Sequence, residues 1–367
     1  MSVIDLHYTW LVINSIVGCS NGCKYCFLFN QYPEITVYAS PEESITQLLQ
    51  YPYYDKDIPL CLFPNTDIFL SENNRSYLLK ILEIIEKKGI FNDIVLITKC
   101  KIPDYIIERF KKFQENGHNI VIYLSYSGLN QELEPNVNPD EIVNNFKKLS
   151  ENKIPVVHYY RPFIPQNSDK NKIKALLDRV KNYSQACVVT GLMVDSKKLE
   201  FYDFWQELKD INLSELSHSS SVWPEESWKF FQHQSTLRNT YFLNSCALNS
   251  VFQRPCFYYG TEECNRSCSC DLEQRERCQR AVQEIDFDFV LKKLHYILKE
   301  FNLEGYQYVI HSNNSIELIG DPLPTQILIY LIHILGVKVF SKNSRGLNDV
   351  YNSCLNDSKA YILRRNK

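Results

Sequence analysis

Three cysteines near the N-terminus, Cys19, Cys23 and Cys26, stand in the pattern Cys-x3-Cys-x2-Cys. Three thiolates hold three irons of a [4Fe–4S] cubane and leave the fourth iron open to another ligand, whereas an electron carrier closes its cluster with four. Gly18 and Gly22 lack a Cβ and can take the positive φ values that wrap a loop around a cluster. A zinc knuckle is the alternative, although structural zinc usually takes four ligands in two separated pairs. The spacing therefore favours an iron–sulfur site with one open iron.

A second group of cysteines lies between residues 246 and 278 and holds six of the 13 in the chain. The tightest four-ligand set is Cys264, Cys268, Cys270 and Cys278, with Cys246 and Cys256 as possible replacements or neighbours. Two metal chemistries compete for these thiols, a second [4Fe–4S] cluster and a structural zinc ion. We expect a second, auxiliary [4Fe–4S] cluster, with zinc and no metal as the alternatives.

The first loop, with Tyr25 directly before its last cysteine, resembles that of the radical S-adenosylmethionine (SAM) superfamily. The resemblance implies that Cys19, Cys23 and Cys26 are catalytic and that the amino and carboxylate groups of SAM bind the open iron. It further implies reductive cleavage of SAM to a 5′-deoxyadenosyl radical, which abstracts hydrogen from a substrate. An external reductant such as flavodoxin or ferredoxin would supply the electron.

Further polar residues follow the next predicted strands: Thr66 and Asp67, Lys99, Ser125, Glu134 and Arg161. Together with the first loop they resemble the spore photoproduct lyase-like branch of that superfamily, over residues 8–192. Photoproduct repair itself is not implied, because the repair enzyme has a hydrogen-donating cysteine beside its acidic motif. Here Cys61 lies six residues before Asp67, inside an apolar strand, where a cysteine usually acts as a small hydrophobe.

This resemblance implies a cofactor-binding set made of Tyr25, Thr66, Asp67, Lys99, Ser125 and Arg161. Thr66 and Asp67 would meet the methionyl amino group or the ribose, Lys99 would pair with the carboxylate, and Ser125 would touch the ribose. A zwitterionic methionyl group needs one cation and one anion, which agrees with these residue types. Arg161 and Glu134 would bind substrate or brace the site.

The elements that must position these residues follow an alternating pattern. Short apolar runs predict strands at 8–14, 60–63, 94–98, 120–125, 156–160 and 187–192. Amphipathic stretches predict helices at 41–51, 76–88, 102–112, 139–152 and 170–182. Strands alternating with helices indicate a parallel sheet, and about six such units fit a partial (β/α)6-type barrel of the radical SAM kind. Chemistry in such barrels gathers at the C-terminal ends of the strands.

The alternation stops near residue 195, and the remainder divides into two parts. We expect a radical SAM core over 1–215, a cysteine-rich auxiliary metal region over 216–285 and a small α+β module over 286–367. In that module the pattern predicts helices at 286–300 and 325–335, a hairpin at 306–318 and a strand at 337–340. We expect the C-terminal region to cover the substrate above the barrel mouth.

Composition narrows the function classes. A net charge of −3 argues against coating nucleic acid by bulk electrostatics, although a local basic groove remains compatible with it. No signal peptide or membrane span is visible, so we expect a cytoplasmic protein without a membrane partner. The substrate remains a nucleobase or nucleic acid, a small metabolite or a peptide. The competing class is a non-enzymatic iron–sulfur or zinc redox sensor, which would not need Lys99, Asp67 and Ser125 at strand ends.

Overall fold

The computed structural model describes residues 2–26, 28, 32, 34–194, 202–210, 221–232, 239–256, 268–311, 315–341 and 360–363. Within them, six strands form the parallel sheet that the sequence predicts: β2 (Leu11–Ile13), β5 (Leu60–Leu62), β6 (Ile94–Thr98), β7 (Ile120–Ser125), β8 (Val156–Phe163) and β9 (Ala186–Met193). They are paired in this order, each parallel to the next. The predicted mixed α/β fold is thus confirmed.

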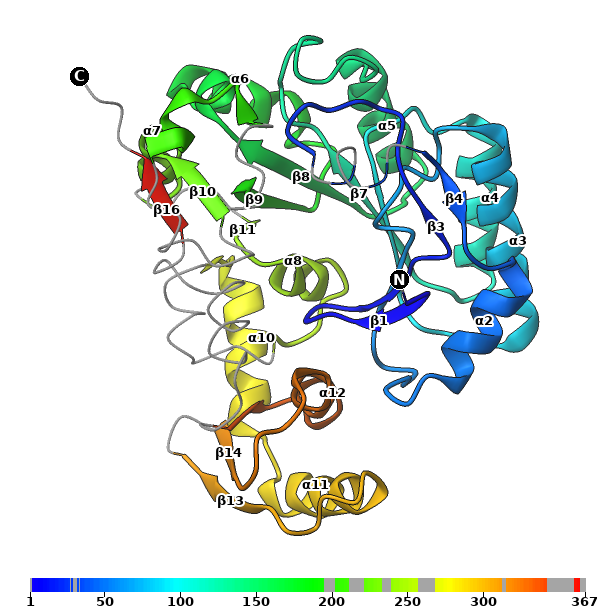
Figure 1. Ribbon diagram of the computed structural model, residues 1–367, viewed down its shortest axis with the longest axis vertical. Helices are drawn as coiled ribbons and strands as arrows, with labels where there is room; N and C mark the ends of the chain where they lie inside the picture. The colour runs from blue at the N-terminus through cyan, green and yellow to red at the C-terminus, as the bar shows by residue number, and fades with distance from the viewer. Residues whose placement is uncertain are drawn as a thin grey trace.

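Both edges of this parallel array carry antiparallel strands. β1 (Ile4–Leu6) pairs with β2, and β10 (Ser221–Pro224) pairs with β9. The order β1-β2-β5-β6-β7-β8-β9-β10-β16 ends in β16 (Ala360–Leu363) and does not return to β1. The barrel is therefore partial, and its sheet curves without closing (Figure 1).

Five helices connect the parallel strands and cover the convex face of the sheet (Figure 1). They are α2 (Pro41–Gln50), α3 (Glu72–Lys88), α4 (Asp104–Glu115), α5 (Pro139–Glu151) and α6 (Lys170–Val180). Side chains of Ser40, Ser71, Asn138 and Asp169 cap four of these helices by accepting backbone N–H bonds in the first turn. Each helix buries one apolar face on the sheet, as the sequence periodicity predicts.

The structure also contains smaller elements that the sequence did not predict. The hairpin strands β3 (Ile16–Val17) and β4 (Thr36–Val37) flank the first cysteine loop. The remaining ones are the short helices η1 (Pro165–Asn167), η3 (Gln206–Asp210), α7 (Glu225–Gln232) and α8 (Asn244–Val251), and the strands β11 (Thr240–Tyr241) and β12 (Cys268–Ser269). β11 pairs with β9 and with β12, so the sheet continues past residue 215 into the cysteine-rich stretch.

Helix α8 lies against the concave face of the open sheet (Figure 1). The Tyr123 hydroxyl of β7 donates to the Asn244 carbonyl at 3.1 Å, and the Asn244 amide donates to the Tyr159 hydroxyl of β8 at 3.3 Å. Tyr123 and Tyr159 also meet edge to face, with ring centroids 5.4 Å apart. Tyr123, Tyr159 and the start of α8 thus pack together on the concave face of the sheet.

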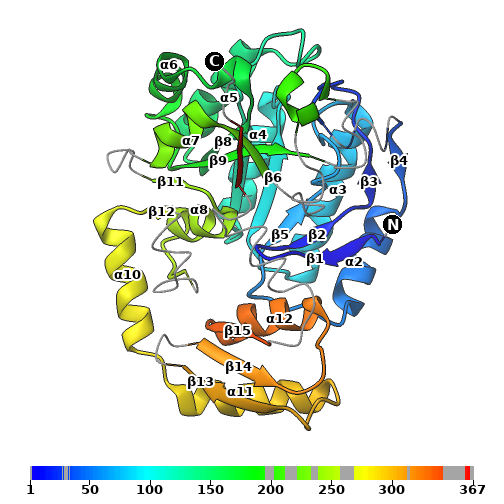
Figure 2. The ribbon, with the colours of Figure 1, turned by 60° about the vertical axis from the view of Figure 1, so that its left-hand side comes forward.

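A three-stranded sheet with two helices forms the predicted C-terminal α+β module (Figure 2). Its elements are α11 (Phe287–Glu300), β13 (Gln307–Ile310), β14 (Ser315–Ile319), α12 (Thr325–Leu335) and β15 (Lys338–Phe340). Helix α10 (Leu272–Gln283) leads from the barrel to this module, and α12 contacts β1. In the part of the chain that the structure describes, no helix is long and apolar enough to cross a membrane.

Candidate functional site

The first cysteine loop follows β3 and is fastened to the segment after β5. The Gly18 amide donates to the Asn65 carbonyl at 2.9 Å, and the Thr66 hydroxyl donates to the Gly18 carbonyl. Gly18 has a φ of 102°, and a Cβ there would lie 2.1 Å from the Glu34 carbonyl oxygen. Only glycine fits this close approach of two backbone segments. The three cysteines are thereby placed at the C-terminal ends of the parallel strands.

The thiols of this loop lie partly or fully below the surface. Cys23 is buried, while Cys19 and Cys26 are partly exposed. Burial raises the pKa of Cys19 to about 11 and that of Cys23 to about 12, and the nearby Lys99 charge only partly offsets the effect on Cys23. A bound metal cation is the usual means of keeping such thiols deprotonated. Three thiols on one glycine-shaped loop have the chemistry that an iron–sulfur cluster needs.

Asp67 binds four donors of the surrounding protein. Its Oδ1 accepts from the Thr98 hydroxyl at 2.7 Å and from the Phe69 amide at 3.2 Å. Its Oδ2 accepts from the Lys99 amide at 2.8 Å and, at the long limit of 3.5 Å, from the Asn21 side-chain amide. A carboxylate offers about four acceptor positions, so these contacts use them all. This geometry makes Asp67 a brace between the cysteine loop and β6.

A buried ion pair lies beside this brace. The Lys99 ammonium donates to Glu134 Oε1 at 2.7 Å, with only 15% of the lysine and 5% of the glutamate side chain exposed. The Tyr25 hydroxyl donates to the same oxygen, and the Lys99 Nζ lies 5.6 Å from the centre of the Tyr25 ring. Burial first and Glu134 second raise the pKa of Tyr25 well above its usual value, so this hydroxyl stays protonated and keeps donating.

Glu134 reaches this position because its loop is tied to the cysteine loop. The Lys24 amide donates to the Leu133 carbonyl at 3.0 Å, and the Asn136 side chain donates to the Ser20 carbonyl at 3.1 Å. The sequence placed Glu134 among residues that bind substrate or brace the site, and the structure shows a brace for Lys99 and Tyr25. Sequence reasoning missed Asn21, since no pattern marks a lone asparagine between two cysteines as a partner of Asp67.

Ser125 and Arg161 stand at the ends of the neighbouring strands β7 and β8. Ser125 is 4% exposed and lies opposite Tyr159 in the strand register. The Arg161 guanidinium lies 4.2 Å from the centre of the Tyr159 ring and close enough to Cys61 to influence it electrostatically. Among the described residues, Arg161 has no carboxylate partner, in contrast to Lys99. The two residues therefore bring one polar hydroxyl and one uncompensated cation to this end of the sheet.

The second cysteine group lies toward the other end of the strands. Cys246 of α8, Cys256 and Cys278 of α10 are all buried, and Cys246 Sγ is 3.7 Å from Cys256 Sγ. Close by, the Arg254 guanidinium donates to Asp93, which directly precedes β6, at 3.0 Å. Of the predicted four-ligand set, Cys278 joins this cluster and Cys270 is partly buried. Cys264 and the side chain of Cys268 lie outside the described residues.

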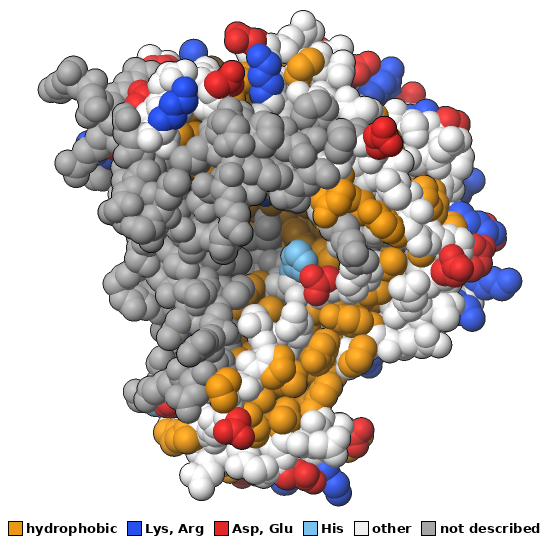
Figure 3. Space-filling view, viewed as in Figure 1, with side chains coloured by type: hydrophobic (Ala, Val, Ile, Leu, Met, Phe, Trp, Pro, Cys, Tyr) orange, Lys and Arg blue, Asp and Glu red, His pale blue; other side chains and the backbone are white. Residues whose placement is uncertain are grey.

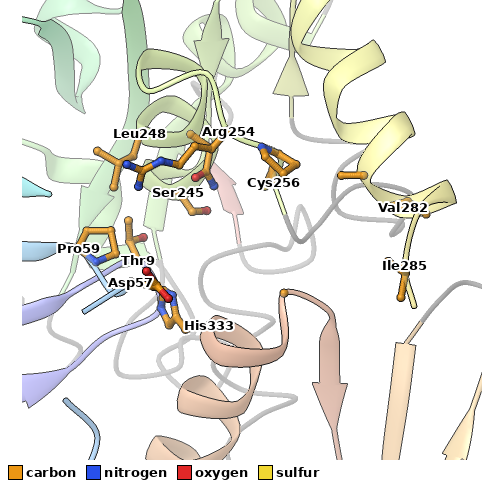
Figure 4. A pocket seen from close by; sticks show the side chains of 14 residues that line it. Thr9, Asp57, Pro59, Ser245, Leu248, Arg254, Cys256, Val282, Ile285 and His333 are labelled. Atoms are coloured by element: carbon orange, nitrogen blue, oxygen red, sulfur yellow. The ribbon is translucent and has the colours of Figure 1, made fainter. Parts of the chain in front are cut away.

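A pocket of about 280 Å³ opens beside this second group (Figure 4). The barrel contributes Thr9, Asp57 and Pro59 to the lining of the pocket, and the segment after α8 contributes Arg254 and Cys256. Further lining residues are Val282 at the end of α10, Ile285 after that helix and His333 of α12. On this side the molecule is hollowed between the barrel and the C-terminal module, with apolar side chains around the hollow (Figure 3). None of the first-loop cysteines lines the pocket.

The described residues 244–256 and the C-terminal module thus pack near the N-terminal ends of the strands, because they meet Thr9, Pro59 and Asp93 there. The prediction that the C-terminal region covers the barrel mouth is not met by these residues. Within the ranges that the structure describes, no set of three or more His, Cys, Asp or Glu side chains is already arranged to hold a metal ion.

No protein-family model matches the sequence, and no curated protein matches it. Among solved structures, the chain is similar to a radical SAM methyltransferase from Sphaerobacter thermophilus, with 14% identity and a TM-score of 0.39 over 52% of this chain and 58% of that one. It is also similar to Streptococcus suis SuiB bound to S-adenosylmethionine, with 14% identity and a TM-score of 0.40 over 54% of this chain and 47% of that one. The chain matches about half the length of these proteins, and TM-scores this low establish no shared function.

Proposed function

We propose that this chain is a radical SAM enzyme whose [4Fe–4S] cluster is held by Cys19, Cys23 and Cys26. The observation that carries the proposal is the position of these thiols. They lie on one loop at the C-terminal ends of six parallel strands, beside the Lys99–Glu134 pair and the Asp67 brace. A (β/α) sheet presents its catalytic groups at this end. A protein that used the cysteines only as a zinc knuckle or redox sensor would have no need of the buried polar network around them.

A [4Fe–4S] cluster held by the three thiolates, together with bound SAM, would supply reductive cleavage of SAM and a 5′-deoxyadenosyl radical that abstracts hydrogen from the substrate. The protein's own residues position this chemistry. Asp67 and Thr66 fix the cysteine loop against the strand ends, and Glu134 holds the Lys99 ammonium and the Tyr25 hydroxyl in place. An external one-electron donor, such as a flavodoxin or ferredoxin, would reduce the cluster.

Polar ligand groups would be bound by Lys99, Ser125 and Arg161. The Arg161 guanidinium suits a carboxylate, because its planar edge forms two parallel hydrogen bonds while its face rests on Tyr159. Ser125 at the adjacent strand end suits a ribose hydroxyl. The spore photoproduct lyase-like branch remains the proposed relationship, resting on these residues and their spacing in the sequence.

We also propose the division into a core over 1–215, a cysteine-rich region over 216–285 that holds an auxiliary [4Fe–4S] cluster, and a module over 286–367. A cytoplasmic location is also proposed, because the cysteines cluster in metal-binding patterns rather than in a disulfide framework, as is usual in a reducing compartment.

The test is formation of 5′-deoxyadenosine after anaerobic reconstitution with iron and sulfide and reduction with dithionite. The wild type should bind about four irons in the first loop and release 5′-deoxyadenosine from SAM. Cys23→Ala should do neither, while Cys187→Ala, which removes a buried thiol from β9, should do both. A reconstituted wild type that yields no 5′-deoxyadenosine would leave the redox-sensor alternative in its place.

A further inference from the structure

Asn244, the first residue of α8, has one unsatisfied hydrogen-bonding atom beside the concave face of the sheet. Its backbone carbonyl accepts from the Tyr123 hydroxyl at 3.1 Å, and its side-chain amide donates to the Tyr159 hydroxyl at 3.3 Å. Its side-chain oxygen, Oδ1, is buried and has no hydrogen-bond partner among the described residues. Nearly all buried polar atoms in folded proteins have a partner, so this acceptor is open to a donor from a bound molecule.

Arg161 brings an unpaired cation to the same tyrosine. Its guanidinium lies 4.2 Å from the centre of the Tyr159 ring, and within the described ranges no carboxylate pairs with it. The Lys99 ammonium, by contrast, is paired with Glu134 at 2.7 Å. A guanidinium that rests one face on an aromatic ring still presents its planar edge, which forms two parallel hydrogen bonds with a carboxylate.

Tyr159 connects these two groups. The Arg161 cation lies over the face of its ring, and the Asn244 side chain lies at its hydroxyl. The ring is on the concave side of the sheet, because it meets the Tyr123 ring edge to face and Tyr123 contacts α8 through its hydroxyl. One aromatic side chain thus separates an unpaired cation from an unpaired acceptor. A molecule that satisfies both carries an anionic group and a hydrogen-bond donor.

The charge balance selects the kind of anion. The Lys99–Glu134 pair is neutral as a whole, so Arg161 contributes the one uncompensated charge among these three side chains. A carboxylate carries one negative charge, which a single guanidinium balances. A phosphate monoester carries about 1.5 to 2 negative charges at pH 7, and part of that charge would lack a partner here. A carboxylate is therefore the better match for Arg161.

We propose that Arg161 and Asn244 determine the substrate specificity of the proposed enzyme, with Arg161 binding a carboxylate and Asn244 Oδ1 accepting from an amide N–H. The substrate class is a peptide with a free carboxyl end, which carries both groups within a few bonds. The assignment rests on the proposed function for the reaction and narrows its candidate substrates to this class. A nucleobase has N–H donors but no carboxylate, so it would leave Arg161 unpaired.

The experiment measures the binding of short peptides to the anaerobically reconstituted full-length chain with SAM present, by isothermal titration calorimetry. The probes are acetyl-alanyl-alanine, its C-terminal amide, and the analogue methylated at both amide nitrogens. The wild type should bind the amide at least about tenfold more weakly than the acid, because the charge-assisted pair with Arg161 is lost. It should bind the methylated analogue about fivefold more weakly, because that peptide no longer donates to Asn244.

Substitutions then assign each preference to its residue. Arg161→Met should remove the preference for the acid over the amide, whereas Arg161→Lys, which keeps a cation, should retain part of it. Asn244→Leu should remove the preference for peptides with amide N–H groups. The matched controls are Arg254→Met, at the opposite strand ends, and Asn249→Leu, at another asparagine of α8. Both controls should leave the two preferences unchanged.

Equal affinity of the wild type for the acid and the amide would overturn the proposal, as would the absence of measurable binding of the acid. Tighter binding of thymidine than of the acid would overturn it in favour of a nucleobase. The same titrations on the Cys19→Ser/Cys23→Ser/Cys26→Ser variant, which lacks the cluster ligands, should give the same preferences. Intact preferences without 5′-deoxyadenosine formation would therefore overturn the proposed function and leave the peptide site in place.

Discussion

The two cysteine groups differ in how the chain delivers their sulfurs. The first places three thiols within residues 19–26 of one loop, whose backbone is fixed by Gly18 and by the segment after β5. The second collects its thiols from two helices and the segment between them, and packs them in the interior. A short loop leaves one side of a metal centre open to a ligand, whereas convergence from several elements encloses it. The first arrangement therefore suits a catalytic centre that binds a ligand, and the second suits a structural role.

The largest effect that separates the two groups is expected from Cys23→Ala. It should abolish 5′-deoxyadenosine formation, a loss of at least about 100-fold, because the cluster loses one of three ligands. Cys256→Ser should leave the iron bound by the first loop intact, since the two groups lie toward opposite ends of the strands. Iron and sulfide analysis of both variants checks this. Equal iron loss in the two variants would show that the groups form one centre.

The buried ion pair of the first site gives the next effect. Lys99→Met leaves the Glu134 carboxylate buried without its cation, at an expected cost of about 3–5 kcal/mol in the free energy of unfolding. The double variant Lys99→Met/Glu134→Gln should recover part of this loss, because no buried charge is left alone. Urea unfolding of both single variants and the double variant measures the coupling. Additive effects would mean that the two side chains do not interact in solution.

Gly18→Ala tests the backbone of the first loop. The added Cβ would meet the Glu34 carbonyl, and the left-handed φ adds a strain of about 1–3 kcal/mol. We expect the loop to shift and the iron content after reconstitution to fall by more than half. Gly305→Ala is the matched control, because a Cβ there meets nothing within 4 Å. Full iron content in Gly18→Ala would show that the loop tolerates displacement.

The smallest effect is expected from a substitution near the N-terminal ends of the parallel strands. Arg254→Met removes the guanidinium that faces buried Asp93, although Arg254 is itself half exposed and the Asn119 amide still donates to Asp93 at 2.8 Å. We expect a loss of about 1–2 kcal/mol in the free energy of unfolding and an unchanged yield of 5′-deoxyadenosine per cluster. Thermal unfolding and the product assay test the two parts. A large fall in product would link this end of the barrel to the chemistry.

The parallel strands and their helices are predictable from the sequence because each leaves a local signature. Ile120–Leu124 is an unbroken run of apolar and aromatic residues before Ser125, and α5 begins at Pro139 after the N-cap Asn138 and is amphipathic. The short strands β11 and β12 have only two residues each, and α8 has only eight residues, half of them Asn or Ser, so none of these elements leaves a clear period to detect.

The candidate site was predictable in its residues but not in all of their contacts. Spacing identifies Cys19, Cys23 and Cys26, since loop ligands are local in sequence. The partners of Asp67 lie 31 and 46 positions away, at Thr98 and Asn21, and only the folded sheet edge brings them together. The second group shows the same limit, because only the packing of α8 and α10 brings Cys256 next to Cys246 and to Cys278, which lie 10 and 22 positions from it.

The most direct test of the central claim is electron paramagnetic resonance of the reduced, reconstituted protein with and without SAM. An open iron in the Cys19, Cys23 and Cys26 loop predicts that SAM changes the g-values of the reduced cluster, and that the change persists in Cys278→Ser. A reduced [4Fe–4S] signal that SAM leaves unaltered would mean that the first cluster has no open iron, and would contradict the assignment.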